Sequence, residues 1–185
     1  MTRRYLVCAA FALLLGVAVA AQRPTGGGGA GGGEGGTESS NMRLVGHSDL
    51  QGRSAYQPEI KRQGDRWIAY VGHHGGNGIN PMTGRDEPNG TSIVDVTDPR
   101  NPRYLAHIPG QVATEGPESG GSQMARVCSG ATLPRGDRNK FYLLRTYGNT
   151  NNASQEMWDV TDPSKPTRIN VIVSGLNGTH KNWWE

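Results

Sequence analysis

The sequence predicts an all-β fold made of short antiparallel strands joined by many turns. Its 185 residues are 34% hydrophobic and only 6% aromatic, and they include 28 Gly and 11 Pro. Such a composition suits turn-rich β structure and disfavours long helices. Two further observations support this fold class: an internal repeat of strand-like segments, and a turn of the same composition within each copy.

The charge balance is close to neutral. The chain has 19 basic and 16 acidic residues, a net charge of +3. Removal of Arg3 and Arg4 with a cleaved leader leaves a net charge of +1. Because nucleic-acid binding needs a markedly basic surface, DNA and RNA are not expected partners.

Residues 1–21 have the composition of a secretory signal peptide. Basic Arg3 and Arg4 precede an apolar run from Tyr5 to about Val19, and small residues follow it. The run is short for a transmembrane segment, so no stable membrane span is expected after leader cleavage. We therefore predict export to the periplasm, the cell surface or the extracellular space, by either the general or the twin-arginine route.

Residues 22–40 are predicted to form a flexible linker. Within them the sequence GGGGAGGGEGG has nine Gly in eleven residues. Such a segment has almost no side chains to bury and a large backbone entropy to lose on folding. The folded region is therefore predicted to span residues 41–185.

An internal repeat organises the folded region. Residues 92–109 and 156–173 align without a gap at an offset of 64 residues. Upstream of each copy lies a matching turn, at Gly64 and at Gly136, followed by an apolar run with strand character. A further strand-like segment precedes each turn. Each unit therefore holds about four short strands, and the two units span about 54–109 and 122–173.

Each unit contains an Asp-Pro turn between its third and fourth strands. Asp98 and Asp162 suit the first position of a type I turn, where the carboxylate accepts a nearby backbone N–H, and the following Pro presets φ. We interpret these two aspartates as turn caps and not as a catalytic pair. Asp95 and Asp159, three residues earlier, are expected to face a strand surface or to bond to the adjacent turn.

Partial copies at both ends indicate a ring of such units. Residues 41–47 resemble 101–107 and are expected to form a lone fourth strand, and a third unit should begin with a strand at His180. A propeller closes its ring by completing the last blade with the first strand of the chain. We therefore predict two four-stranded antiparallel propeller blades plus orphan strands, an incomplete β-propeller that continues past Glu185. Its unpaired edges predict self-association of this chain.

The segments SIVDVTDPRNP and EMWDVTDPSKP resemble the LVIVD repeat, in which an apolar strand ends in Asp and a D-P-x-x-P turn follows. Residues 93–96 fit that pattern, whereas Met157 and Trp158 depart from it. The resemblance covers about residues 54–173. It implies a secreted bacterial β-propeller-like protein, with no settled activity and no functional residues to carry over.

Three histidines are candidate ligand-binding residues. His73 and His74 open the long segment 77–89, which lacks periodicity, and long loops are often functional. Neutral imidazoles bind transition metals, but no zinc spacing occurs, so metal binding stays open and solvated histidines are the alternative. His180 begins a strand that would line the central channel of a propeller. No cofactor is predicted.

Trp183, Trp184 and Cys128 have simpler interpretations. The two tryptophans are expected to pack on opposite faces of a sheet. Because Cys8 leaves with the leader, Cys128 has no intrachain partner and is either buried and inert or paired with another chain.

The favoured function is a secreted, non-enzymatic module that binds a protein or a carbohydrate. The sequence contains no G-x-S-x-G motif and no phosphate loop. The alternative is a propeller-based hydrolase or oxidoreductase whose active site lies partly outside this chain, because fold alone does not fix function. A structural protein anchored in the envelope is a third possibility.

Overall fold

The structure is a computed structural model that describes residues 43–184. By its contacts the chain divides into two units, Met1–Asn41 and Met42–Glu185. The expected leader and linker lie outside the described residues. The described part is all-β, with no α-helix and three one-turn 3-10 helices, η1 (Leu50–Gly52), η2 (Pro117–Ser119) and η3 (Gly130–Thr132). None of its helices has the length and apolar character needed to cross a membrane.

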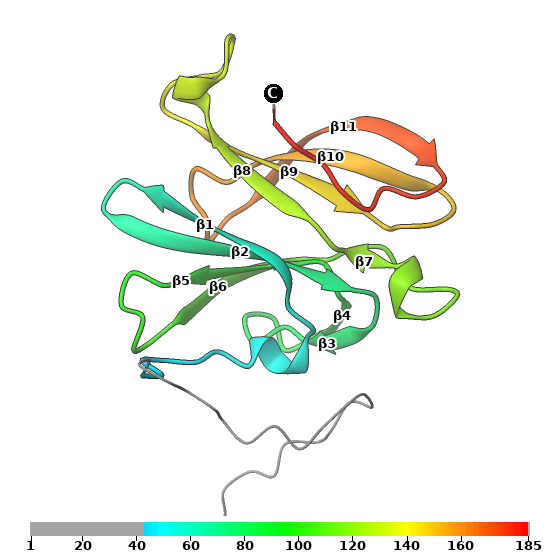
Figure 1. Ribbon diagram of the computed structural model, residues 1–185, viewed down its shortest axis with the longest axis horizontal. Coiled ribbons are helices and arrows are strands. Elements are labelled where there is room, and N and C mark those ends of the chain that lie inside the picture. The colour runs from blue at the N-terminus through cyan, green and yellow to red at the C-terminus, as the bar shows by residue number, and fades with distance from the viewer. Residues whose placement is uncertain (1–42, 185) are drawn as a thin grey trace, which may run out of the picture. The chain divides into compact units, whose positions relative to one another are not determined.

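The first sheet is a meander whose main path has the order β1-β2-β5-β6 (Figure 1). Its strands are β1 (Tyr56–Gln63), β2 (Arg66–His74), β5 (Thr91–Asp95) and β6 (Arg103–Ile108). A two-residue turn joins β1 to β2, and its first residue, Gly64, has the positive φ of 65° that such turns require. The short strand β7 (Gly121–Ser122) pairs with the end of β2, off the main path.

The second sheet is also a four-stranded antiparallel meander. It has the order β11-β10-β9-β8 and consists of β8 (Ala125–Ser129), β9 (Phe141–Tyr147), β10 (Ala153–Asp159) and β11 (Thr167–Leu176). The structure therefore contains two consecutive four-stranded units, as the repeat predicts. Neither sheet is closed into a barrel.

The long segment after His74 is not a structureless loop. It folds into a two-stranded hairpin of β3 (Asn77–Ile79) and β4 (Asp86–Pro88). The guanidinium of Arg53 anchors this hairpin, because it donates to Gly78 O at 2.6 Å and to Asn89 Oδ1 at 2.8 Å. Arg53 is 5% exposed, so the anchor is part of the packed structure.

The two Asp-Pro turns have the predicted capping role. Asp98 Oδ1 accepts the backbone N–H two residues further on at 3.0 Å, and its carbonyl accepts the N–H three residues further on at 3.0 Å. Asp162 makes both contacts at the same distances. The turns connect β5 to β6 and β10 to β11, so they are equivalent third-to-fourth-strand connections.

Asp95 and Asp159 bond to these same turns, as expected. Asp95 Oδ1 accepts the N–H of Thr97 at 3.0 Å, and Asp159 Oδ1 accepts that of Thr161 at 3.0 Å. Burial opposes ionisation of Asp95, but hydrogen bonds from Thr97 and from two arginines outweigh it and hold the pKa of Asp95 well below its usual range.

Strand pairing fixes the equivalent positions of the two sheets. Ile68 lies opposite Asp95 in the first sheet, and Tyr142 lies opposite Asp159 in the second. Residues of β2 and β9 therefore correspond at an offset of 74, and those of the third and fourth strands at 64. The matching turns at Gly64 and Gly136 are 72 residues apart, because the second turn is two residues longer.

The two sheets pack face to face, with β1 and β2 beside β8 (Figure 1). Their shared core is made of fully or nearly buried apolar side chains. From the first sheet come Ile68, Tyr70, Ile93, Leu105, Ala106 and Ile108, and from the second come Ala125, Val127 and Leu143, with Val160 just beyond β10. Apolar burial of this kind is the main stabilising term in folding.

The two expected orphan strands are not strands in the described residues. The segment 43–47 pairs with no described strand, and Leu44 is 74% exposed. Residues 180–184 lie beside β8 but contact it through side chains, since Trp184 Nε1 donates to Arg126 O at 3.0 Å. A strand needs a ladder of backbone hydrogen bonds, and a side-chain contact does not supply one.

Candidate functional site

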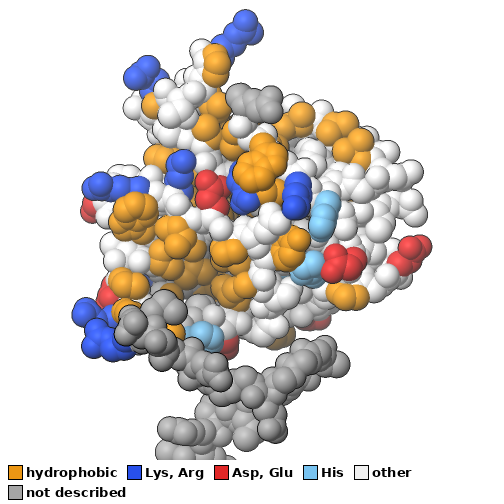
Figure 2. Space-filling model, viewed as in Figure 1, with side chains coloured by type: hydrophobic (Ala, Val, Ile, Leu, Met, Phe, Trp, Pro, Cys, Tyr) orange, Lys and Arg blue, Asp and Glu red, His pale blue; other side chains and the backbone are white. Residues whose placement is uncertain are grey.

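Aromatic and polar side chains lie along β1, the end of β2 and the C-terminal segment. We call Tyr56, His74, His180, Trp183 and Trp184 the aromatic strip. The ring of Tyr56 lies edge-on to that of His74, with centroids 4.5 Å apart, and 6.0 Å from that of His180. Figure 2 shows apolar and histidine side chains side by side on this face, with charged side chains among them.

Two of the three predicted histidines meet in this strip. His74 and His180 both lie beside Tyr56, although more than 100 residues separate them in the sequence. His74 Nδ1 also lies 2.9 Å from Glu118 Oε1, at ion-pair distance but without hydrogen-bond geometry. The strip therefore places imidazole, phenol and carboxylate groups on one accessible surface.

His73 lies on the opposite face and is fully buried. Successive residues of a strand point to opposite faces, so His73 and His74 cannot share one surface within β2. Its Nδ1–H donates to the carbonyl of Ser54, and its Nε2 lies 2.8 Å from Ser92 Oγ. Burial lowers the pKa of His73 to about 4, so its ring is neutral. The idea of a solvated histidine is wrong at this position.

The Ser92–His73 pair contains the residue types of a nucleophile and its base. Both side chains have no exposed surface, so a substrate does not reach either of them. His107 lies 6.0 Å from His73, and burial lowers its pKa also to about 4. Its Nε2 lies 3.0 Å from Pro88 O. We interpret this cluster as a buried network that holds the β3–β4 hairpin on the sheet.

A hollow of about 400 Å³ lies beside the two tryptophans of the strip. Charged side chains and one thiol line it together with the indole rings: Glu59, Lys61, Arg126 and Cys128. Arg126 lies over the ring of Trp183 at 4.8 Å, which is cation–π distance. Glu59 Oε2 accepts the backbone N–H of Val127 at 2.7 Å, which joins β1 to β8 at the hollow.

Trp183 is not the packing residue that the sequence predicts. Its side chain is 65% exposed, whereas Trp184 is half-buried. The guanidinium of Arg126 holds one face of the Trp183 indole, so an exposed aromatic ring is kept in a defined place. Cys128 is likewise half-buried and not fully buried, and its Sγ lies 3.1 Å from Thr132 Oγ1.

No group of three or more His, Cys, Asp or Glu side chains in the described part of the chain is placed to hold a metal ion. In the strip each of the two imidazoles lies beside the ring of Tyr56. The arrangement suits stacking and hydrogen bonding to a ligand surface.

Comparison with known proteins finds no counterpart, since no family model, no curated protein and no solved structure matches the chain. The LVIVD resemblance therefore stays a prediction that rests on the repeat and its turns.

Sequence reasoning missed Tyr56, which lies beside both histidines of the strip, and Arg126, which lies over the ring of Trp183. Tyr56 stands at the start of β1 and Arg126 within β8, and neither belongs to a motif. The adjacent tryptophans near the C-terminal end were the available signal for the rest of the strip.

Proposed function

We propose that this chain is an exported LVIVD-like repeat protein of β-propeller type that binds a carbohydrate at the aromatic strip. The predicted signal peptide supports export. Two meander sheets with the same turn chemistry and the same register support the blade interpretation. The site lies where the first strands of both sheets come together.

The exposed indole of Trp183, held over Arg126 beside a polar hollow, carries the proposal. A sugar ring presents an apolar C–H face and a rim of hydroxyl groups. The indole face offers a stacking surface for the first, and Glu59 and Lys61 offer an acceptor and donors for the second. A hollow of about 400 Å³ is within the size range of small-ligand sites.

A protein ligand is the second candidate. Trp, Tyr and Arg are the residues most enriched at the energetic centres of protein interfaces, and the strip contains or touches all three.

A glycan array probed with the exported chain tests the proposal, followed by titration with the glycans that bind. We expect Trp183→Ala to weaken binding by at least about tenfold, equal to about 1.4 kcal/mol. Trp67→Ala is the matched control, because Trp67 is also exposed, at 46%, and lies outside the strip. No bound glycan on the array, or equal loss in both variants, would overturn carbohydrate binding at this site.

A further inference from the structure

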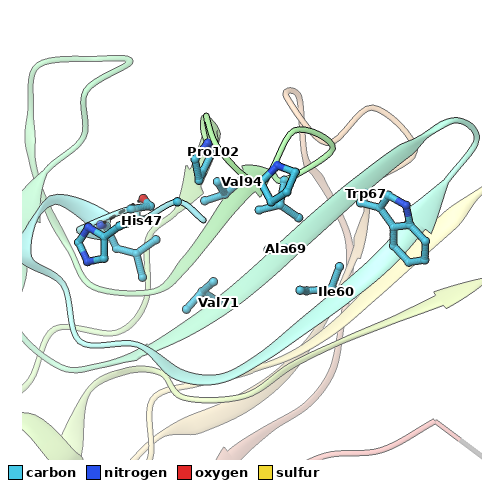
Figure 3. A pocket seen from close by; sticks show the side chains of 12 residues that line it. His47, Ile60, Trp67, Ala69, Val71, Val94 and Pro102 are labelled. Carbon is cyan, nitrogen blue, oxygen red and sulfur yellow. Dashed lines mark hydrogen bonds between the residues drawn. The ribbon is translucent and has the colours of Figure 1, made fainter. Parts of the chain in front are cut away.

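An apolar groove of about 500 Å³ crosses the face of the first sheet that points away from the second. Figure 3 shows Ile60, Ala69, Val71 and Val94 lining it, with His47 and Trp67 toward opposite ends. Ile60 is 57% exposed and Trp67 is 46% exposed on this groove, whereas Ala69, Val71 and Val94 are buried, at 2–7% exposed, and pack with Leu50.

The equivalent face of the second sheet is covered. Ala69 corresponds to Leu143, and Val96 corresponds to Val160, by the strand register. Leu143 and Val160 have no exposed surface, because they pack against the first sheet in the shared core. The groove is thus equivalent to the face of the second sheet that the first sheet covers.

The outer face of the second sheet is uncovered, whereas the equivalent face of the first sheet is buried. Tyr142, Met157 and Ile169, which we call the outer patch, correspond to Ile68, Ile93 and Leu105 of the first sheet. Those three counterparts are buried in the shared core. In the second sheet Ile169 is 46% exposed, and the outer patch lines a hollow of about 420 Å³.

The contact between the two sheets has two sides, and each outer face of the chain is equivalent to one of them. The groove corresponds to one side and the outer patch to the other. Ala69 and Val71 alternate with the core residues Ile68 and Tyr70, so the groove faces away from the core. Tyr142 alternates with Leu143 in the same way. Because groove and outer patch lie on opposite sides of the two-sheet stack, they cannot meet within one copy.

We propose that a second copy of this chain docks its outer patch into the groove, so that sheets stack front to back between copies as they do within one. The contact is heterologous, so every added copy still presents one free groove and one free outer patch. The proposal does not depend on ligand binding at the aromatic strip.

Sedimentation of the exported chain over a range of concentrations tests the proposal, with one variant for each surface. Ile60→Lys places a charge in the groove, and Ile169→Lys places one in the outer patch. Both side chains are about half exposed, at 57% and 46%, so the folded monomer tolerates them. Val112→Lys is the control, because Val112 is 60% exposed and lines neither surface.

We expect the wild type and Val112→Lys to associate beyond the dimer as concentration rises. Each surface variant alone should associate at least about tenfold more weakly, because a buried lysine charge is unpaired there. An equimolar mixture of the two variants should form a one-to-one dimer that grows no further, since one good groove then meets one good outer patch.

A wild type that stays monomeric at every concentration would overturn the proposal. So would a mixture in which the two variants do not pair, or a dimer that survives Ile169→Lys, which would indicate groove-to-groove contact. Thermal unfolding of each variant checks that it is folded, and Trp67→Lys replaces Ile60→Lys if the latter is destabilised.

Discussion

The two sheets share their strand register and turns, but at equivalent buried positions the first has uncharged side chains and the second has charged ones. Ser92 of the first sheet corresponds to Glu156 of the second, and Val71 corresponds to Arg145. The first sheet buries neutral, hydrogen-bonded groups around Ser92, whereas the second buries an ion pair. A repeat of this kind therefore specifies backbone and turn but not the polar content of each core.

The ion pair of the second sheet is enclosed on all sides. Arg145 is 1% exposed, and its Nη2 lies 2.8 Å from Glu156 Oε2. Burial lowers the pKa of Arg145, and the facing Glu156 opposes that shift. Burial would raise the pKa of Glu156, but Arg145 and hydrogen bonds, including one from the Trp158 indole, lower it below its usual range. Both groups are therefore charged at neutral pH.

Arg145 also joins the two sheets. Its guanidinium donates to Ile108 O at 3.0 Å and to Pro109 O at 2.7 Å, both at the end of the first sheet. At the equivalent place on the first sheet Val71 offers no such donor, which is why the groove is apolar. The ion pair thus lies at the interface between the two sheets of one chain.

The largest expected effect comes from breaking that ion pair. Arg145→Met leaves Glu156 charged and buried, and it also leaves two backbone carbonyls without their donor. We expect a loss of about 3–5 kcal/mol in the free energy of unfolding. Urea denaturation of wild type and variant measures it.

Arg168→Met is the matched control, because Arg168 also bonds Glu156, at 3.1 Å, but is 55% exposed. It should lose less than about 1 kcal/mol. Adding Glu156→Leu to Arg145→Met should restore part of the loss, because the unpaired charge is then gone. A double variant no more stable than Arg145→Met would show that lost packing, not charge, dominates.

The neutral cluster of the first sheet predicts a different response, to pH. His73 and His107 each have a pKa of about 4 in the fold, below the ordinary value of about 6.5 in the unfolded chain. The unfolded chain therefore binds more protons below pH 6.5, and stability falls as pH falls until about pH 4. The lowered pKa of each histidine should reduce the free energy of unfolding by about 2 kcal/mol between pH 7 and pH 5.

Urea denaturation across that range checks the slope, with His73→Gln as the variant. Its stability should depend on pH less steeply than that of the wild type. His47→Gln is the control, because it replaces a histidine by the same residue at an exposed position outside the buried cluster. Carboxylates with a lowered pKa, such as Asp95, stop stabilising the fold only at lower pH. They therefore do not contribute to the slope between pH 7 and pH 5. A slope that His73→Gln leaves unaltered would contradict the assignment.

The strands and the turns between them were predictable because their signals are local. Alternating apolar residues indicate strands, and an Asp-Pro pair presets a type I turn wherever it occurs. The orphan strands expected at residues 41–47 and after His180 are not strands in the described residues 43–47 and 180–184. A strand depends on a partner, and no described strand pairs with either segment.

The site was predictable only in part, because it is assembled from distant segments. His74 and His180 were chosen separately, but Tyr56, which lies beside both, carries no motif. His73 was placed in the same loop as His74, whereas both stand in β2 and point to opposite faces. The Arg145–Glu156 pair was missed because the repeat aligns Glu156 with Ser92 but does not show that Glu156 is buried beside an arginine.

The smallest expected effect tests whether the two turns are energetically equal as well as similar in shape. Thr97 Oγ1 accepts the N–H of Trp67 at 2.9 Å, and Thr161 Oγ1 accepts that of Phe141 at 3.1 Å. Replacing either threonine with valine keeps its shape and removes the acceptor.

Each Thr→Val variant should lose about 1 kcal/mol in urea denaturation, and the matching Thr→Ser variants, which keep the hydroxyl, should lose less. The two losses should agree within about 0.5 kcal/mol, because the two hydroxyl groups make equivalent hydrogen bonds at equivalent positions of the two turns. A much larger loss at Thr97 would mean that the first turn is coupled to the groove beside it. In that case Thr97→Val should also weaken self-association, whereas Thr161→Val should not.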